Sequence, residues 1–378
     1  MDAVVISGAG PTGLMTAIRL AELGFEPIVL EEDKQAGIPE NCTGLISSTG
    51  ATELNLDLKK SLVNTIKGAD IIAPDGTTLA IRKKSDVALV LDRKEFDKTL
   101  CEKAISLGAK IEFNSKIIDL RQNTLFFQKK ERGEIKKIKV LVGADGPLSL
   151  VRKLAGISAP PDSFVYTYQE RVEGDFDSKK VKMFFGSFAP GFFAWIVPES
   201  EKIARIGLGV SHGHNPAEKF SEFKQKTGLE FETLEKKGYL IPIGPPLKSV
   251  AEKNILLVGD AAFQTKASTG GGIITGMLSA LKCAEAIADH LKYGKPLNNY
   301  NSLLSEINKD LKSHWKMRSF LNKQSDEKLN KLFAKAKTSG LEEFLEEYGD
   351  MDRPSRFLGK MLSKPRLWGL AGLAIRFR

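Results

Sequence analysis

Three glycines near the start of the chain have the spacing of a phosphate-binding turn. Gly8, Gly10 and Gly13 follow an apolar run and lead into a helical pattern, with Pro11 inside the turn. In a G-x-G-x-x-G turn, the first glycine permits a tight bend, the second lets the backbone approach a pyrophosphate, and the third lets the helix pack closely on the strand. The helix N-terminus then offers unpaired N–H groups to the phosphates. The spacing therefore predicts a dinucleotide site, with a chance glycine turn as the alternative.

Two acidic residues follow the next expected strand, residues 27–30. Glu31 lies 18 residues after Gly13, and Glu32 comes next in the chain. A carboxylate at this distance can accept hydrogen bonds from ribose hydroxyls. Up to this point, the pattern is compatible with both NAD(P) and FAD.

A second glycine-led helix start occurs late in the chain. The apolar run 255–258 leads into Gly-Asp-Ala-Ala, with Asp260 as its acid, and Gly271, Gly272 and Ile273 then open a long helical pattern. FAD offers two targets to helix N-termini, the pyrophosphate and the N1/O2 edge of the flavin, whereas a nicotinamide dinucleotide offers only the first. The second helix start therefore favours FAD.

Two further motifs lie between these glycine turns. Asp92 precedes a helical pattern that begins at Arg93, and Glu95 completes a capping box with Asp92. The sequence Gly-Ala-Asp-Gly at 143–146 follows an apolar run and places an acid at the carboxyl edge of the expected sheet, where ligands bind in such folds. An ordinary Asp-Gly turn is the alternative for the second motif.

The intervening pattern supplies the elements that must position these residues. The Pro-Asp-Gly-Thr run at 74–77 predicts a hairpin turn, and short strand-like runs over 110–142 predict a β-meander that leads back to the parent sheet. Residues 160–246 are dense in aromatics and alternate strand-like runs with Gly/Pro turns. We expect them to form an antiparallel sheet that lines an apolar pocket. The alternative is that these aromatics only fill the core of the sheet.

Composition excludes several classes of protein. The chain has 378 residues with 42% hydrophobic and 27% charged residues, which is typical of a globular protein. No run approaches the roughly 18 apolar residues that a membrane span requires. The three cysteines show no paired spacing, which argues for a cytoplasmic protein without disulfides or a zinc site. His212 and His214 are interpreted as polar loop residues, so we expect no metal.

The net charge of +9 is concentrated near the C-terminus. The 26 residues from Arg353 carry seven Lys/Arg and no acid, interleaved with apolar and aromatic residues. Such a segment can lie on an anionic membrane surface, which would make the protein peripheral on the membrane. The alternative is a C-terminal helix packed on the domain. No nucleic-acid-binding module accompanies the charge, so we expect no nucleic-acid partner.

The motifs described above occur in one fixed order. G-A-G-P-T-G, D-R-K-E-F-D, G-A-D-G and G-D-A-A together resemble the flavoprotein superfamily that includes aromatic hydroxylases and geranylgeranyl reductases. The resemblance covers residues 1 to about 290 and implies FAD, with Asp260 near the ribityl and pyrophosphate and Arg93 near the flavin. Phe263 stands where the hydroxylases typically carry His, which counts against that branch.

Two features are similar to the geranylgeranyl reductase branch. One is G-x-P-x-x-C, which ends at Cys42; in that branch this cysteine lies by the flavin and affects activity. The other is similar to P-x-x-Y-x-W-x-F-P, a pattern that grips an isoprenoid chain. It runs here from Pro190 through Phe193 and Trp195 to Pro198, with Phe193 in place of Tyr and Val197 in place of Phe.

The resemblance implies an α/β fold: a Rossmann-like FAD-binding domain with an antiparallel-sheet substrate domain and C-terminal helices. We expect the FAD-binding domain at 1–159 and 247–295, the substrate domain at 160–246 and the helical region at 296–378.

The expected activity is reduction of C=C bonds in geranylgeranyl chains of membrane lipids. Reduced flavin supplies the hydride, and Cys42 donates a proton, positions the alkene or, alternatively, only fills space. The alternative function is an FAD-dependent monooxygenase of a small apolar or aromatic substrate. The electron donor is left open among NAD(P)H, ferredoxin and other reductants.

Overall fold

The structure is a computed structural model that describes residues 3–40, 42–361 and 363–368. The last part of the basic C-terminal segment, residues 369–378, lies outside the described residues.

A mostly parallel sheet carries the glycine turn. Its strand order is β19-β20-β12-β1-β2-β8, and every pair is parallel except β19 with β20. The strands are β1 (Val4–Ser7), β2 (Ile28–Leu30), β8 (Lys110–Glu112), β12 (Val140–Gly143), β19 (Ala251–Glu252) and β20 (Ile255–Leu257). Every residue of β1, β12 and β20 is buried, as expected for parallel strands covered on both faces.

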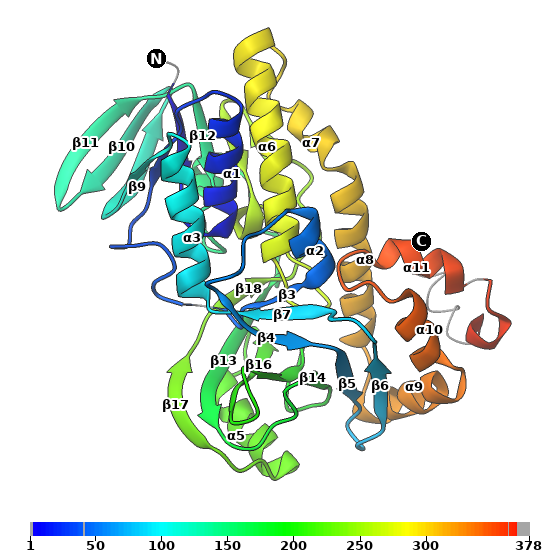
Figure 1. Ribbon diagram of the computed structural model, residues 1–378. Helices are drawn as coiled ribbons and strands as arrows, with labels where there is room; N and C mark the ends of the chain where they lie inside the picture. The colour runs from blue at the N-terminus through cyan, green and yellow to red at the C-terminus, as the bar shows by residue number, and fades with distance from the viewer. Residues whose placement is uncertain (1–2, 41, 362, 369–378) are drawn as a thin grey trace.

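Helices α1 (Pro11–Glu22), α3 (Arg93–Ser106) and α6 (Ile273–Tyr293) lie side by side along this sheet (Figure 1). Each begins as the sequence predicts. α1 and α6 start behind glycines, and the Asp92 side chain accepts a hydrogen bond from the Glu95 N–H at the start of α3. The short α4 (Leu150–Leu154) contacts β12 and β20.

The predicted meander is partly wrong. Residues 110–112 form β8 at the edge of the parallel sheet, where they pair with β2. The meander consists instead of β9 (Ser115–Arg121), β10 (Thr124–Lys129) and β11 (Arg132–Lys137). β11 is not predictable from the sequence because its residues are polar and mostly exposed, so no apolar alternation marks it.

The large second sheet is mixed rather than antiparallel. Its order is β17-β13-β16-β15-β14-β5-β6, with β18 also paired to β13. The strands are β5 (Gly68–Ile72), β6 (Thr78–Arg82), β13 (Phe164–Glu173), β14 (Lys180–Phe184), β15 (Ala194–Pro198), β16 (Ile203–Ser211), β17 (Glu232–Lys237) and β18 (Leu240–Pro242). β14 and β5 are parallel, which brings in the predicted hairpin β5–β6 from outside 160–246. We therefore propose that the second domain contains 68–82 in addition to 160–246. Helix α5 (Pro216–Thr227) packs on β13 and β16.

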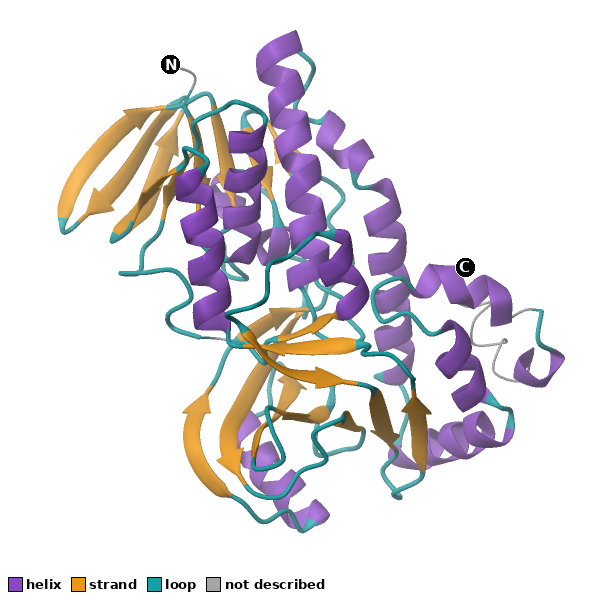
Figure 2. Cartoon of the chain, in the orientation of Figure 1, coloured by secondary structure: helices purple, strands orange, loops and turns teal. Residues whose placement is uncertain are grey.

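A small antiparallel sheet stands between the two large ones. It has the order β3-β7-β4, with β3 (Leu45–Ser47), β4 (Leu62–Ile66) and β7 (Ala88–Leu91). The cartoon shows these strands between the helical layer and the second sheet (Figure 2). Helix α2 (Ser48–Glu53) follows β3 directly.

The C-terminal helices run from α6 to the β6 edge of the second sheet. They are α7 (Asn299–Leu303), α8 (Ser305–Leu321), α9 (Asp326–Thr338), α10 (Leu341–Tyr348) and α11 (Pro354–Met361). The 3-10 helices are η1 (Gly259–Ala262) and η2 (Pro365–Leu367). α9 and α10 contact β6, and the buried side chains of Met361 and Leu367 belong to the same hydrophobic cluster as Phe193 and Trp195. In the described ranges, no helix is both long and apolar enough to cross a membrane.

Candidate active site

A cavity of about 1200 Å³ lies between the parallel sheet and the second sheet. One part of its lining comes from the β1–α1 turn, the end of β2, the start of α3 and the residues before α6. Another part comes from β14, β15, the residues just before β7 and the loop after α10. We call the first, glycine-rich part of the cavity the cradle and the second part the apolar branch. The two parts form one continuous cavity.

The cradle fits a dinucleotide because two helix N-termini face it without a side-chain cap. Gly10 precedes α1, Gly272 precedes α6, both line the cavity, and neither helix start has a side-chain cap hydrogen bond. A Cβ built on Gly10 meets nothing within 4 Å, so its backbone is open to the cavity. N–H groups left without a side-chain cap in this way can donate hydrogen bonds to phosphate oxygens and to the flavin O2 edge.

The other glycines are required by packing. Gly8 has φ +100°, and a Cβ on it would lie 2.4 Å from the Ala144 carbonyl oxygen. Gly13 does not line the cavity. A Cβ there would lie 2.0 Å from the Gly8 carbonyl oxygen, which is the close helix–strand approach that the sequence motif predicts.

The two acids after β2 have different environments. Glu31 is fixed by the backbone, because Oε2 accepts from Ala9 N–H at 2.6 Å and Oε1 accepts from Asp33 N–H at 2.9 Å. Burial raises the pKa of Glu31 above its ordinary value, and the hydrogen bonds from these two N–H groups offset only part of this rise. Glu32 lines the cavity but pairs with Lys116 at 2.6 Å on the exposed side. Glu31 is therefore the better placed of the two for ribose hydroxyls.

Asp260 and Arg93 enter the cavity from η1 and α3. Asp260 Oδ1 accepts from the Thr265 hydroxyl at 2.9 Å, and burial raises the pKa of Asp260. Arg93 makes a two-bond ion pair with Asp97, at 2.9 Å and 2.7 Å. Burial alone would lower the pKa of Arg93, but the charges of Asp97 and Cys42 and the hydrogen bonds to them together outweigh burial and raise that pKa.

A buried lysine in the cradle was missed by the sequence analysis. Lys266 lines the cavity and pairs with Asp352 at 2.5 Å, and a Cβ on Gly271 would lie 2.9 Å from its Cε. Asp352 comes from the loop between α10 and α11, so the partner that keeps this lysine buried lies 86 residues away in the chain. Nothing in the local sequence around Lys266 marks this pair.

Cys42 lies where the cradle meets the apolar branch. Its Sγ accepts from Gly44 N–H at 3.3 Å. The next residue, Thr43, donates to Gln169 Oε1 at 2.7 Å, and its hydroxyl lies 3.1 Å from the Tyr239 hydroxyl. Trp195 Nε1 donates to the same Gln169 oxygen at 3.1 Å. Because an indole N–H only donates, this contact fixes Gln169 as an acceptor and links Trp195 to the Cys42 loop.

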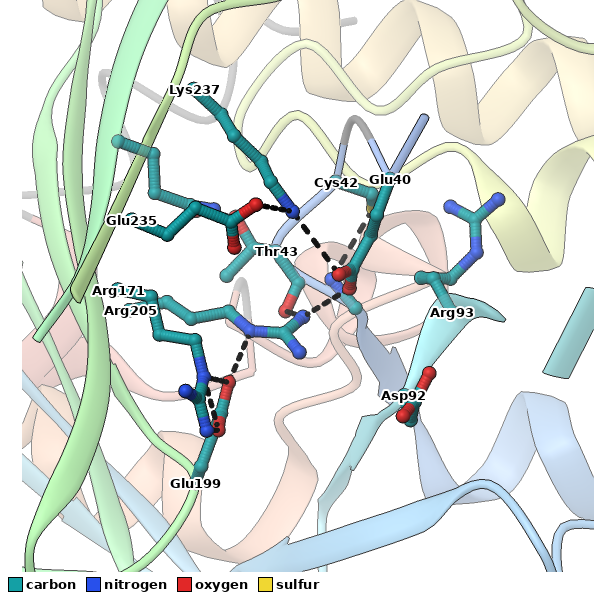
Figure 3. A network of polar contacts seen from close by, with 12 residues as sticks. Glu40, Cys42, Thr43, Asp92, Arg93, Arg171, Glu199, Arg205, Glu235 and Lys237 are labelled. Atoms are coloured by element: carbon teal, nitrogen blue, oxygen red, sulfur yellow. Dashed lines mark hydrogen bonds and ion pairs between the residues drawn. The ribbon is translucent and has the colours of Figure 1, made fainter. Parts of the chain in front are cut away.

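An ion-pair network from the second sheet holds the Cys42 loop (Figure 3). Arg205 on β16 donates to the Thr43 carbonyl at 2.8 Å and pairs with Glu40 at 3.1 Å and with Glu199 at 2.6 Å. Lys237 on β17 pairs with Glu40 at 3.2 Å. Burial raises the pKa of Glu199, but its arginine partners more than offset this and lower that pKa below its ordinary value.

Aromatic side chains wall the apolar branch. Phe193 stacks on Phe192 with ring centroids 4.2 Å apart and meets Trp195 edge-on at 5.9 Å. Arg318 on α8 lies 4.4 Å from the Phe192 ring and donates to the carbonyls of Ala267, Phe192 and Ser268. Burial lowers the pKa of Arg318 to about 9. Arg318 is not predicted as a site residue, because an arginine in an amphipathic helix has the sequence pattern of a surface residue.

Two predicted substrate-binding residues do not reach the cavity. The described lining contains Phe193 and Trp195 but neither Pro190 nor Pro198. The Pro190 carbonyl accepts from Ser211 N–H, and the Pro198 carbonyl accepts from Asn64 Nδ2. These prolines therefore bound the β15 segment and fix its position, and the prediction that they bind substrate is not supported by their placement.

Comparison with known proteins identifies the relatives of this chain. The model of the FAD binding domain family matches residues 1–207. A digeranylgeranylglycerophospholipid reductase of Methanothrix thermoacetophila is 30% identical over 350 residues, which are 87% of this chain and 90% of that protein. The digeranylgeranylglycerophospholipid reductase of Methanocaldococcus jannaschii is also 30% identical, over 87% of this chain and 89% of that protein.

A solved structure shares the whole fold. The crystal structure of a geranylgeranyl bacteriochlorophyll reductase-like protein from Thermoplasma acidophilum matches with a TM-score of 0.85 and 22% identity, covering 99% of this chain and all of that one. The predicted fold class, the predicted cofactor FAD and the predicted family are confirmed. The chain belongs to the FAD-binding-domain flavoproteins and, within them, to the digeranylgeranylglycerophospholipid reductase family.

Proposed function

We propose that this protein reduces C=C bonds in the geranylgeranyl chains of glycerophospholipids or their precursors. The observation that carries the proposal is the joining of the FAD cradle to an aromatic-walled branch in one cavity of about 1200 Å³. Relatives over nearly the full length are named for reduction of such lipids. A long isoprenoid chain needs an apolar channel that reaches the flavin, and this cavity provides one.

Different residues of this chain have different roles in the proposed reaction. FAD, once reduced, supplies the hydride to one alkene carbon. Phe193 and Trp195 hold the chain by apolar contact and exclude water. Cys42 holds the proton for the other carbon at Sγ, at the junction of the cradle and the apolar branch. Arg93, which also lines the cavity, places a fixed positive charge near Cys42.

The FAD contacts are proposed residue by residue. The backbone N–H groups of the first turn of α1, which follows Gly10 and begins at Pro11, donate hydrogen bonds to the pyrophosphate. Glu31 accepts hydrogen bonds from the ribose hydroxyls. The backbone N–H groups around Gly271, Gly272 and Ile273, at the start of α6, donate hydrogen bonds to the flavin O2 edge. The half-buried Asp260 faces the ribityl chain.

Anaerobic reduction tests this function. The FAD-loaded protein is reduced with dithionite and mixed with a geranylgeranyl glycerophospholipid under anaerobic conditions. We expect lipid products heavier by two hydrogens per double bond. Oxygen-dependent gain of one oxygen atom by a substrate, with no hydrogenated lipid, would favour the monooxygenase alternative instead.

Cys42→Ser separates the chemical role of Cys42 from a packing role. The substitution keeps the side-chain size, so FAD should remain bound while the reduction rate falls at least about tenfold, as expected for loss of a proton donor. Unchanged turnover would assign Cys42 to packing.

We also propose contact with an anionic membrane surface. Exposed cations lie on α11 (Arg356, Lys360), just before η2 (Lys364) and on η2 (Arg366), whereas Met361 and Leu367 are buried in the protein. The exposed cations therefore supply the membrane contact rather than these buried residues. Lys364→Glu with Arg366→Glu should weaken binding to vesicles containing anionic lipid, and equal binding would remove this proposal. The electron donor stays a choice among NAD(P)H, ferredoxin and other reductants, which stopped-flow reduction of the bound FAD by each compound separates.

A further inference from the structure

A second, very small cavity lies behind the Cys42 loop. Its volume is about 10 Å³. The described residues that line it are Glu40, Cys42, Gln169, Arg171, Arg205, Glu235 and Lys237. Of these seven, Cys42 is the one that also lines the large cavity. The thiol residue therefore separates an apolar reaction space from a polar space of the size of one water molecule.

One carboxylate oxygen in this small cavity has no hydrogen bond. Glu40 Oε1 is buried and lacks a hydrogen-bond partner in the described structure, although it forms an ion pair with Arg205 at 3.1 Å. A buried polar atom without a hydrogen bond destabilises the folded protein. A water molecule in the cavity would satisfy it and would also find donors and acceptors among the other lining side chains.

Glu40 is connected to the protein surface. Its Oε2 lies 3.2 Å from Lys237 Nζ, and Lys237 also pairs with Glu235 at 3.1 Å. The Lys237 side chain is 20% exposed and that of Glu235 is 50% exposed. Figure 3 shows Glu40 between Lys237 and the Cys42 loop. The groups that face Glu40 are thus Arg205 and Lys237, with Arg171 and Glu235 on the same cavity and Asp97 close enough for its pKa to be raised by the Glu40 charge.

We propose that Glu40, through one water in the small cavity, resupplies the proton of Cys42 from the solvent side. The inference rests on the proposed function. Each C=C reduced takes a hydride from reduced FAD and a proton from Cys42, so the S–H bond breaks as the second C–H bond forms. Lys237 Nζ then passes a proton to the Glu40 carboxylate, Glu40 passes it to the water, and the water passes one to the thiolate. Lys237 regains its proton from bulk water.

This route answers a physical need of the apolar branch. Each turnover consumes a proton, yet aromatic walls exclude the water that would return it. An inlet behind Cys42 returns the proton without wetting the alkene. Glu40 is therefore a relay residue: it touches neither the alkene nor FAD in this scheme, and it acts through Cys42.

The test compares Glu40→Gln with Glu235→Gln. Glutamine keeps the size and hydrogen bonding of Glu40 but cannot carry a proton. We expect lipid reduction by Glu40→Gln to fall at least about tenfold, within the range of general acid–base effects, with FAD content unchanged. The solvent deuterium isotope effect should rise, because proton resupply becomes rate-limiting. Glu235→Gln removes a neighbouring carboxylate on the same lysine and should change the rate less than about twofold, since Glu235 is outside the relay.

Two readouts do not depend on turnover. A high-resolution crystal structure of the wild-type protein should contain an ordered water within hydrogen-bond distance of both Glu40 Oε1 and Cys42 Sγ. Alkylation of Cys42 by iodoacetamide should have a midpoint at lower pH in Glu40→Gln than in the wild type, because loss of a nearby negative charge favours the thiolate. Glu40→Asp, which keeps a carboxyl group, should recover part of the rate. If Glu40→Gln fails to fold, Lys237→Met tests the same relay and should also lower the rate.

The contrary results are distinct. Wild-type turnover and isotope effect in Glu40→Gln, or a dry small cavity, would overturn the relay while leaving the reductase function intact. If the wild-type protein reduces no geranylgeranyl lipid, the proposed function fails. In that case the ordered water and the alkylation midpoint still decide whether Glu40 and Cys42 share a proton.

Discussion

The FAD cradle and the Cys42 junction are built in different ways. In the part of the cradle formed by the β1–α1 turn and β2, a key pair is close in sequence: Ala9 and Glu31, joined by a 2.6 Å hydrogen bond, are 22 residues apart. At the junction, Thr43 bonds Gln169 across 126 residues and contacts Tyr239 across 196. This part of the cradle is therefore a property of short motifs, whereas the junction exists only when the second sheet is in place against the Cys42 loop.

The difference extends to what holds each region. The cradle depends on backbone geometry, such as the φ of +100° at Gly8. The junction and the aromatic wall depend on buried side-chain hydrogen bonds and ion pairs, from Arg205 and Arg318. Substitutions and pH should therefore damage the two regions separately.

Gly13→Ala should have the largest effect, and it acts on the cradle. Its Cβ would lie 2.0 Å from the Gly8 carbonyl oxygen, so the strand and helix must separate. Overpacking of this kind costs about 3 kcal/mol in unfolding free energy and should abolish FAD binding. Urea unfolding and the absorbance of bound flavin measure both effects. The matched control is Gly10→Ala, whose Cβ meets nothing within 4 Å. It should unfold like the wild type and bind FAD more weakly; equal instability of both variants would contradict the packing argument.

Acid should lower the stability of the region where α8 packs beside the aromatic wall, through His314 on α8. This ring lies between the Ser268 hydroxyl and the Asp352 carbonyl, and burial, with the charge of Lys266, lowers its pKa from 6.5 to about 4. The folded protein therefore keeps His314 neutral, and the unfolded chain binds the extra proton between those values. Stability should fall by up to about 3 kcal/mol as the pH drops from 7 toward 4.

The control for this pH effect is His314→Gln, measured by urea unfolding at pH 7 and pH 4.5. The variant should lose less stability over this interval than the wild type, because carboxylate titrations are common to both. Identical losses would show that His314 does not contribute.

Arg318→Met should weaken the aromatic wall and leave the cradle intact. The substitution keeps the apolar stem but leaves the carbonyls of Ala267, Phe192 and Ser268 without this donor. We expect a loss of about 2 kcal/mol in stability and slower lipid reduction, with FAD still bound. Loss of FAD at unchanged lipid affinity would show that the two regions are not separable in this way.

Thr43→Val should have the smallest effect of these changes. It removes the hydroxyl that joins Gln169 and Tyr239 while keeping the side-chain volume. About 1 kcal/mol of stability should be lost, with a several-fold fall in turnover and no change in FAD content. Thr49→Val, at another cavity-lining threonine, is the control and should leave turnover near the wild-type value.

Much of the fold was predictable because its signals are local. The glycine spacing at Gly8 to Gly13, the cap at Asp92 and the apolar run before Asp260 each mark a strand end or a helix start, and the structure has those elements. The predictions of secondary structure and strand pairing were wrong where the local sequence carries no signal. β11 is polar and exposed, so it carries no alternation, and the parallel pairing of β14 with β5 joins segments far apart in the chain.

The candidate site divides along the same line. The sequence by itself determined the cofactor cradle, the position of Cys42 and the aromatic segment at Phe193 and Trp195, because each is a short run of fixed spacing. Only the tertiary structure decided that Pro190 and Pro198 lie away from the cavity, that Arg318 and Lys266 are buried, and that Cys42 stands between a large cavity and a small one. Burial and charge pairing depend on which distant segments meet, and no local run of residues encodes that meeting.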